Sequence, residues 1–281
     1  MKRVLTCGVL SLACLVFLPA CIFLPSEVPR YSWAESEFDA ELVNLLIGHA
    51  DGLYHEPRTP ERVRRSFLLC EVSISRHDNY SGFWRAMRAC AWLAENHTDE
   101  DERERYALYG VGLGLDAIKH CGRRPEPHYY YALCLGFLMR EQGAFGGADR
   151  VEIMDKHCKQ VLEIDEKFDS AGAHRFLGVL YLETEAIPFI DVGTYEDSVR
   201  HLERACELFP DYGYNQLALA RTLLDDDEYD KAQGCLQRVV QSPVPENEKA
   251  EHGAWVTEAK ELLEEIEEEI ENEPENENEI R

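Results

Sequence analysis

The side chains best able to do chemistry in this chain are scattered histidines and cysteines and one acidic run. His120-Cys121 and His157-Cys158 are adjacent pairs. Neighbours on a helix point about 100° apart, so neither pair can grip one metal ion. Asp225-Asp226-Asp227-Glu228 could bind a cation through carboxylate oxygens, but adjacent acids between helices more often cap the next helix. The sequence carries no nucleophile-elbow, phosphate-loop or zinc-protease motif. We therefore expect no catalytic residue, metal or cofactor, and a protein that is not an enzyme.

Aromatic residues offer a better candidate site than the titratable groups do. His128-Tyr129-Tyr130-Tyr131 opens a predicted helix, and consecutive helical residues cannot all be buried, so one or two of these tyrosines should face an open groove. An aromatic groove with a few polar atoms suits a small organic ligand or an extended peptide, whereas packing between helices is the alternative interpretation. The expected groove residues are Trp84, Arg88, Tyr129, Tyr130, Tyr131, Phe145 and Phe189.

The first residues of the chain have the pattern of a signal sequence for export. Lys2 and Arg3 precede an apolar run from 4 to 18, which is short for a membrane span and typical of a signal peptide. The run ends in Leu18-Pro19-Ala20-Cys21, which resembles the bacterial lipobox, in which the cysteine receives a lipid. We expect a signal peptide over residues 1–20, lipidation of Cys21 and a tether over residues 21–33. Cleavage near Ala20 without lipidation is the alternative.

The net charge of −25 bears on the partners of the protein. A chain this acidic repels phosphates, so nucleic acid is not an expected partner. Residues 261–281 hold eleven glutamates and one arginine. We expect residues 264–281 to form an acidic, disordered tail, with a docking segment for a basic partner as the alternative.

Ten cysteines are present, and three of them fall within the N-terminal segment. The other seven show no CxxC spacing, so neither a zinc site nor a thioredoxin-like site is indicated. Most occupy positions where a small apolar side chain fits between helices, which predicts buried thiols. Disulfides remain the alternative, because the predicted compartment is oxidising.

Two stretches of the chain match at a shift of 34 residues. Tyr195, Ser198, Leu202 and Ala205 recur as Tyr229, Ala232, Leu236 and Val239. This period is that of the tetratricopeptide repeat, in which a pair of antiparallel helices forms one unit and successive units stack. We expect an all-α fold, a tetratricopeptide-repeat-like α-solenoid of antiparallel helix pairs over residues 34–263, with about eleven helices. The predicted helices include 38–53, 59–75, 84–93, 103–120, 129–140 and 254–270.

Short motifs across about residues 60–245 carry a family resemblance. They are Phe83-Trp84-Arg85-Ala86, Tyr109-Gly110, Tyr130-Tyr131-Ala132-Leu133-Cys134-Leu135-Gly136, Phe145-Gly146-Gly147, Gly193-Thr194-Tyr195 and Leu202-Glu203-Arg204-Ala205. The pattern resembles the T-component lipoproteins associated with tripartite (TRAP) transporters, and it is also similar to the tetratricopeptide domain of the regulator of microtubule dynamics proteins. The first resemblance implies an all-helical periplasmic lipoprotein that docks with a solute-binding protein of a transporter, and it allows a homo-oligomer.

The predicted function is therefore protein–protein interaction by an envelope-anchored lipoprotein, in the manner of the transporter T component. Two alternatives stay open: a periplasmic binder of a hydrophobic small molecule in the solenoid groove, and a scaffold for envelope assembly. The predicted location is the bacterial cell envelope, facing the periplasm. Ile22 rather than Asp follows Cys21, which favours the outer membrane by resemblance to known sorting rules.

Overall fold

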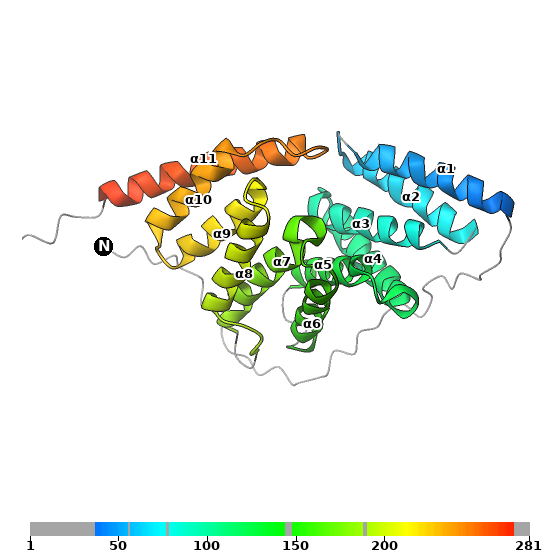
Figure 1. The fold of residues 1–281 in the computed structure, drawn as a ribbon, viewed down its shortest axis with the longest axis horizontal. Helices are drawn as coiled ribbons and strands as arrows, with labels where there is room; N and C mark the ends of the chain where they lie inside the picture. The colour runs from blue at the N-terminus through cyan, green and yellow to red at the C-terminus, as the bar shows by residue number, and fades with distance from the viewer. Residues whose placement is uncertain (1–36, 56, 77–78, 144–147, 188–189, 273–281) are drawn as a thin grey trace, which may run out of the picture. The chain divides into compact units, whose positions relative to one another are not determined.

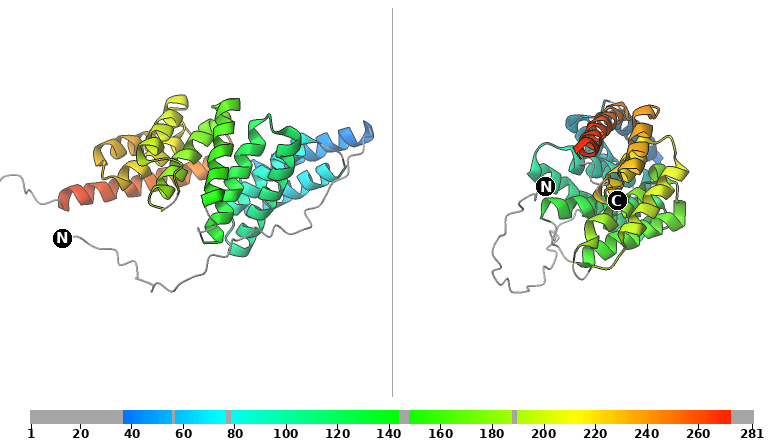
Figure 2. Two further views of the ribbon diagram at one scale, coloured as in Figure 1. Left: turned by 90° about the horizontal axis from the view of Figure 1, so that it is seen from below. Right: turned by 90° about the vertical axis from the view of Figure 1, so that its left-hand side faces the viewer.

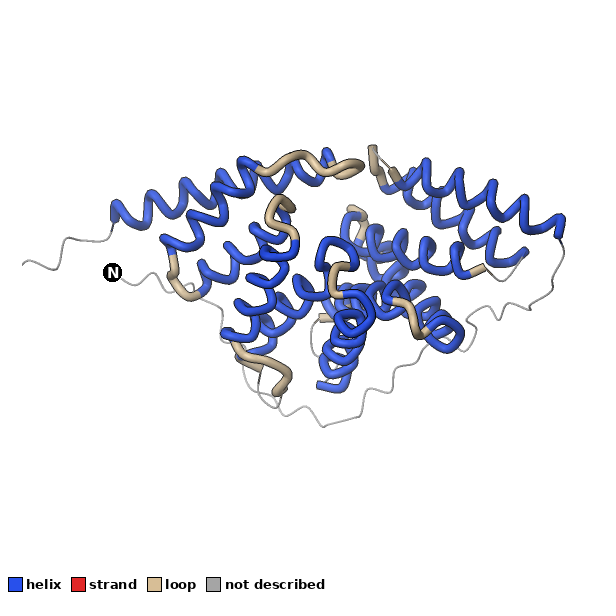
Figure 3. Tube along the Cα trace, viewed as in Figure 1, coloured by secondary structure: helices blue, strands red, loops and turns tan. Residues whose placement is uncertain are grey.

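All secondary structure in the described part of the chain is helical. The computed structural model describes residues 37–55, 57–76, 79–143, 148–187 and 190–272, and Figure 1 and Figure 3 show only helices joined by loops in them. The prediction of an all-α fold with about eleven helices is confirmed for these residues. The helices are α1 (Glu37–Tyr54), α2 (Pro60–Arg76), α3 (Tyr80–Asn96), α4 (Glu100–Cys121), α5 (Pro125–Glu141), α6 (Ala148–Asp165), α7 (Phe168–Glu185), α8 (Tyr195–Leu208), α9 (Gly213–Asp225), α10 (Tyr229–Gln241) and α11 (Lys249–Asn272).

The helices pack as a stacked array rather than around one central core. Every helix contacts the next one along the chain, and each odd-numbered helix also contacts the next odd-numbered one. No two even-numbered helices are in contact within the described residues. The odd-numbered helices therefore line one side of the array, which we call the inner face, and Figure 2 gives two further views of this order.

Small residues let the two helices of a unit approach closely. A Cβ added to Gly178 of α7 would lie 2.4 Å from the Leu202 side chain of α8, so this crossing requires glycine. Beside it, the Ser198 hydroxyl donates to the Gly178 carbonyl over 2.7 Å. Ser66 of α2 makes the same bond to Ala50 of α1 over 2.8 Å. A small hydroxyl residue thus ties the second helix of a pair to the backbone of the first in two separate units.

The cysteines behave as packing residues. None of the seven cysteines in the described part of the chain forms a disulfide, and all of them except Cys121 are buried. Burial raises the pKa of the Cys70 thiol to about 12, which makes it unreactive at neutral pH. The prediction of buried packing thiols is confirmed for these positions, and the alternative of disulfides among them is not.

The acidic C-terminal segment is helical further than expected. We predicted a helix over residues 254–270 and also a disordered tail from residue 264; α11 continues to Asn272, so the helix is confirmed and the tail prediction is wrong for residues 264–272. Ile266, which is 2% exposed, packs in the last apolar cluster together with Ala259, while Leu262 and Leu263 pack against its edge. These residues recur with helical spacing, so they hold one face of the helix and leave the glutamates on the other. Residues 273–281 lie outside the described residues.

Three further predictions concern the N-terminal segment. The expected signal peptide (1–20), the lipidated Cys21 and the tether (21–33) all lie outside the described residues. Among the helices that are described, none combines the length and the apolar character that crossing a membrane requires.

Candidate functional site

One row of large side chains runs along α3 on the inner face. Trp84, Arg88 and Trp92 are spaced four residues apart, so they lie on the same side of this helix. The Arg88 guanidinium lies 4.9 Å from the Trp84 ring centre and 3.8 Å from the ring centre of Tyr54 on α1. Asp51 of α1 accepts from Arg88 over 3.0 Å, which fixes the cation between the two rings. The predicted residues Trp84 and Arg88 are therefore in contact with each other, and both are half-buried.

An open cavity of about 460 Å³ adjoins this row. We call it the N-terminal cavity. Trp84 and Tyr80 line it from α3, and the Tyr80 hydroxyl donates to Glu126 of α5 over 2.6 Å. Its walls combine aromatic rings with charged and amide groups, which suits a side chain of a partner better than a wholly apolar ligand. Its other main lining residues are Val43, Asn44 and Arg124.

The expectation that one or two of the three consecutive tyrosines face an open groove is wrong. Tyr129, Tyr130 and Tyr131 are 3%, 6% and 6% exposed. The reason is the position of α5, which contacts α3, α4, α6 and α7 and so has no free side along this stretch. Tyr131 lies against the His157 ring on the side of α6, with ring centres 4.9 Å apart, and is therefore not an inner-face residue. Phe145 and Phe189 lie outside the described residues.

A strained turn lies at the beginning of α7, directly after α6. Asp169, Ser170 and Ala171 have φ angles of 51°, 54° and 63°, a left-handed conformation that costs a non-glycine residue roughly 1–2 kcal/mol. Two buried side chains hold it in place. Arg175 donates to the Ser170 carbonyl over 3.3 Å and Asn215 to the same carbonyl over 3.1 Å. Backbone strain of this kind persists where the surroundings fix it, and it often marks a functional site.

Arg175 also forms the centre of a buried polar group. It is 8% exposed, and the rings of Tyr212 and Tyr214 lie 5.5 Å and 5.0 Å from its guanidinium. Burial alone would lower the pKa of Arg175, but the surrounding Tyr129, Tyr212 and Asp169 raise it, so the group stays cationic. The Tyr129 hydroxyl donates to Asp169 over 2.7 Å and thereby joins α5 to the strained turn.

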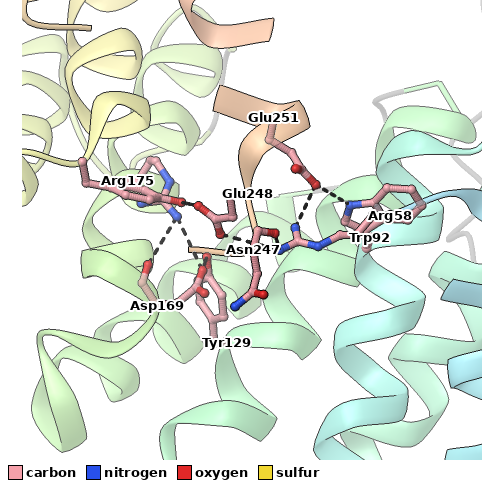
Figure 4. Close-up of polar contacts among 9 residues, drawn as sticks. Arg58, Trp92, Tyr129, Asp169, Arg175, Asn247, Glu248 and Glu251 are labelled. Carbon is pink, nitrogen blue, oxygen red and sulfur yellow. Dashed lines mark hydrogen bonds and ion pairs between the residues drawn. The ribbon is translucent and has the colours of Figure 1, made fainter. Parts of the chain in front are cut away.

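The beginning of α11 contacts the connection between α1 and α2. Arg58 donates to the Glu251 carboxylate over 2.9 Å and to the Asn247 carbonyl over 2.8 Å, as Figure 4 shows. The Trp92 indole donates to the same oxygen of Glu251 over 3.4 Å, and the Tyr212 hydroxyl donates to Glu248 over 3.0 Å. We call this set of interactions the closure contact, because it joins residues 193 positions apart in the sequence.

Some hydrogen-bond donors and acceptors in and beside the closure contact have no partner. Arg58 Nε, Arg88 Nε and Glu251 Oε2 are buried and have no hydrogen-bond partner among the described residues. The Glu248 carboxylate lies 3.9 Å from Arg58, beyond hydrogen-bond distance. Burial raises the pKa of Glu248, although Tyr212 and Arg58 act in the opposite direction. Buried polar atoms are normally paired, so these unpaired atoms indicate capacity for a further polar ligand.

Sequence reasoning missed most of this surface. A row with a spacing of four residues could have added Trp92 to Trp84 and Arg88. The remaining residues come from helix ends and connections far apart in the chain, and no local pattern brings them together. The inner-face cluster comprises Tyr54, Arg58, Arg88, Trp92, Tyr129, Tyr130, Asp169, Arg175, Tyr212, Glu248 and Glu251.

The histidines form pairs with each other rather than with the neighbouring cysteines. His128 and His157 approach through their Nδ1 atoms at 2.7 Å, and so do His174 and His201. His128 Nε2 donates to the Gly122 carbonyl, which can only accept, so its Nδ1 must accept from His157 in the neutral pair. Burial, with the facing histidine second, lowers the pKa of both His157 and His201 to about 4.

The second pair has the same proton order. His174 Nε2 lies 3.1 Å from the Glu166 carboxylate, whose pKa is lowered to about 2 by hydrogen bonds from Arg204 and His174. An ionised carboxylate only accepts, so His174 donates to it and accepts from His201. Within the described residues, no group of three or more histidine, cysteine or acidic side chains could hold a metal ion.

Comparison of structures places the fold among known repeat proteins. A thermophilic tetratricopeptide-repeat protein of Thermus thermophilus superimposes with a TM-score of 0.56, over 81% of this chain and 98% of its own, at 13% sequence identity. A likeness at this identity establishes the fold alone. The predicted tetratricopeptide-repeat α-solenoid is thereby confirmed.

Two bovine (Bos taurus) proteins are similar in sequence. Regulator of microtubule dynamics protein 2 is 30% identical over 102 residues, which are 36% of this chain and 24% of that protein. Regulator of microtubule dynamics protein 1 is 22% identical over 199 residues, which are 65% of this chain and 60% of that protein. The chain therefore matches less than two thirds of the length of either relative.

The family assignment comes from a match over most of the chain. The family described as Regulator of microtubule dynamics protein 1-3 matches residues 46–267, which include nearly all of the helical array and the whole inner-face cluster. Of the two resemblances seen in the sequence, this match supports the one to the regulator of microtubule dynamics proteins, and the resemblance to the T-component lipoproteins of TRAP transporters is not confirmed. The chain belongs to the family of regulator of microtubule dynamics proteins 1-3.

Proposed function

We propose that this protein is an interaction scaffold that binds a partner protein on its inner face. The observation that carries this proposal is the row of Trp84, Arg88 and Trp92 beside the N-terminal cavity. Tryptophan and arginine are the side chains that most often dominate the energy of protein interfaces. Here all three are half-buried, and Arg88 is held by Asp51 and Tyr54, so this side chain has little conformational entropy left to lose on binding.

The family supports a protein partner without naming it. The bovine relatives are named as regulators of microtubule dynamics. We carry over to this chain only the expectation of binding through a tetratricopeptide array. The predicted signal sequence indicates a location outside the cytoplasm, so we do not extend the microtubule connection to this chain.

The finer proposal concerns location and partner. We propose that a lipid on Cys21 tethers the array to the periplasmic side of a bacterial envelope membrane, the outer membrane in our proposal. There the protein would serve a solute-binding protein of a TRAP-type transporter, and it would form a homo-oligomer. The lipobox-like Leu18-Pro19-Ala20-Cys21 and the sequence motifs shared with transporter T components support this proposal.

The test is capture of a partner from intact membranes with matched variants. The full chain, with its own signal peptide, is solubilised in mild detergent and purified as wild type, Trp84→Ala and Leu68→Ala. Leu68 is the control, because it is an exposed apolar residue on an even-numbered helix. We expect a protein retained by wild type and Leu68→Ala and reduced about tenfold or more by Trp84→Ala, since loss of an interface hot spot costs at least about 1.4 kcal/mol.

Two outcomes would contradict the proposal. Retention of the same proteins by all three chains would show that the inner face is not the binding surface. A small organic molecule bound in native mass spectrometry, without a protein, would favour the alternative of a ligand-binding groove.

A further inference from the structure

We propose that the inner face holds a specific site for an acidic protein segment that forms a turn followed by the start of a helix, and that residues 247–251 of the chain itself occupy this site. The inference rests on the proposed function, because it names the chemistry of the partner that the inner face would take. The site consists of Arg58 from the connection between α1 and α2, Arg88 and Trp92 from α3, and Tyr212 from the connection between α8 and α9.

The residues of the chain that occupy the site show how it recognises a segment. Arg58 donates to a backbone carbonyl, that of Asn247, and to the carboxylate of Glu251 four residues later. The indole of Trp92 donates to the same carboxylate, and the Tyr212 hydroxyl donates to Glu248. The site therefore binds one backbone carbonyl and two carboxylates, those of Glu248 and Glu251, at the same time. A guanidinium fork is well suited to such paired acceptors.

The fit of these residues is incomplete, which leaves room for a better ligand. Buried Glu251 Oε2 has no partner among the described residues, and neither has the Nε of Arg58 or Arg88. Glu248 lies 3.9 Å from Arg58 and does not reach hydrogen-bond distance. A buried ion pair gains its full energy only when the remaining donors and acceptors are satisfied. A partner segment whose carboxylates reach all of these donors would bind more strongly than the internal one.

The internal segment, which includes the first residues of α11, can leave while the apolar anchors of that helix stay in place. Residues 242–248 connect α10 to α11 and contain Pro243 and Pro245, and Asn247 has a left-handed φ of 67°. The apolar anchors of α11 lie beyond this segment. Trp255 stacks on Tyr214 with ring centres 5.1 Å apart, and Ala259 and Ile266 lie in the last apolar cluster. Displacement of residues 247–251 therefore exposes the site and leaves the rest of the helix packed.

Charge selects the kind of partner. The chain as a whole carries −25, yet this part of the inner face presents the cations Arg58 and Arg88. Asp51 already pairs with Arg88, so Arg58 is the cation that Glu248 and Glu251 engage. A segment carrying glutamate or aspartate residues replaces these two charges, whereas a basic segment would leave Arg58 facing a like charge.

The test uses the internal segment as a free probe. A fluorescent peptide of residues 244–254, Val-Pro-Glu-Asn-Glu-Lys-Ala-Glu-His-Gly-Ala, is titrated with the full chain and followed by anisotropy. The double variant Glu248→Gln/Glu251→Gln weakens the internal competitor and keeps Arg58. We expect it to bind the peptide at least about tenfold more tightly than wild type does. Adding Arg58→Gln to this variant should abolish binding, and a peptide with Glu248 and Glu251 changed to glutamine should not bind.

The matched control is Arg65→Gln in the double variant, since Arg65 is an exposed arginine of α2, the helix that follows Arg58. Equal affinity of wild type and the double variant, or unchanged binding after Arg58→Gln, would overturn the inference. Circular dichroism checks that each variant is folded. If the double variant does not fold, hydrogen exchange of wild type decides: excess peptide should increase exchange of residues 247–251, and unchanged exchange would overturn the inference. A partner captured through Trp84 without peptide binding would refute this inference alone and leave the proposed function standing.

Discussion

At the scale of single residues, two helical glycines carry opposite constraints. Gly178 of α7 has no space for a side chain, because an added Cβ would lie 2.4 Å from Leu202. Gly234 of α10 has nothing within 4 Å of the same position. The first glycine allows close helix packing, whereas the second only weakens its helix.

We therefore predict opposite effects of alanine at these positions. Gly178→Ala gains helix propensity of about 1 kcal/mol but must push Leu202 aside, and overpacking costs about 1–3 kcal/mol, so the free energy of unfolding decreases. Gly234→Ala should increase it by about 0.5–1 kcal/mol. Urea denaturation midpoints of the two variants measure both effects. A stabilised Gly178→Ala protein would show that the crossing of α7 and α8 is looser than described.

At the level of residues, helical spacing accounts for part of the candidate site. Trp84 and Arg88, which we predicted as groove residues, lie one turn apart and therefore share a helix face, and the structure brings them into contact. Tyr129, Tyr130 and Tyr131 were expected in part to face an open groove but are all buried, because the number of helices that surround α5 is a property of the packed array and not of the sequence around the tyrosines. Arg58 and Glu251 could not be paired from sequence at all, since they are 193 positions apart and nothing local links them.

At the scale of elements, the histidine pairs repeat one arrangement in consecutive units. In each pair the histidine of the odd-numbered helix accepts at Nδ1, and the histidine of the following even-numbered helix donates. The pKa of the donating His157 and His201 is lowered to about 4, mainly by burial, against about 6.5 in the unfolded chain. Between these values the unfolded state binds more protons, so the free energy of unfolding falls as the pH decreases from 6.5 towards 4.

The corresponding prediction uses asparagine, whose side-chain nitrogen lies where Nδ1 was and donates without titrating. His157→Asn/His201→Asn should keep the helix contacts and reduce the fall in melting temperature between pH 7 and pH 5. Calorimetry at both pH values compares wild type with the variant. Other titrating groups, such as Glu248, are present in both proteins, so their contribution to the pH dependence cancels in the comparison. An equally steep fall in the variant would assign the acid sensitivity to other groups.

Element boundaries were predictable where capping and turn signals were present. α8 begins after Thr194 with a reciprocal capping box to Asp197, and the predicted turn at Asp225-Asp226-Asp227 separates α9 from α10 with Asp227 in a left-handed conformation. The start of the disordered tail was placed too early, inside the predicted helix 254–270, because the density of glutamates was given more weight than the spaced apolar residues that bury one side of α11.

At the scale of the whole molecule, the lipid anchor is the prediction with the largest effect. Cys21→Ala should abolish fatty-acid incorporation and move the chain from the membrane pellet to the soluble fraction, since each buried acyl methylene contributes about 0.8 kcal/mol of membrane affinity. Cys14→Ala is the control and should leave both unchanged. Metabolic labelling and fractionation measure the result, and continued labelling of the Cys21→Ala chain would place the lipid elsewhere.

The closure contact also changes how the array should come apart. A linear stack of helix pairs touches only its neighbours, so its two ends fray first and melt at lower temperature than the middle. Here the first connection is bonded to the last helix, so neither terminal unit can open without also breaking its contact with the other. The consequence is greater cooperativity: melting of one end should release the other in the same transition.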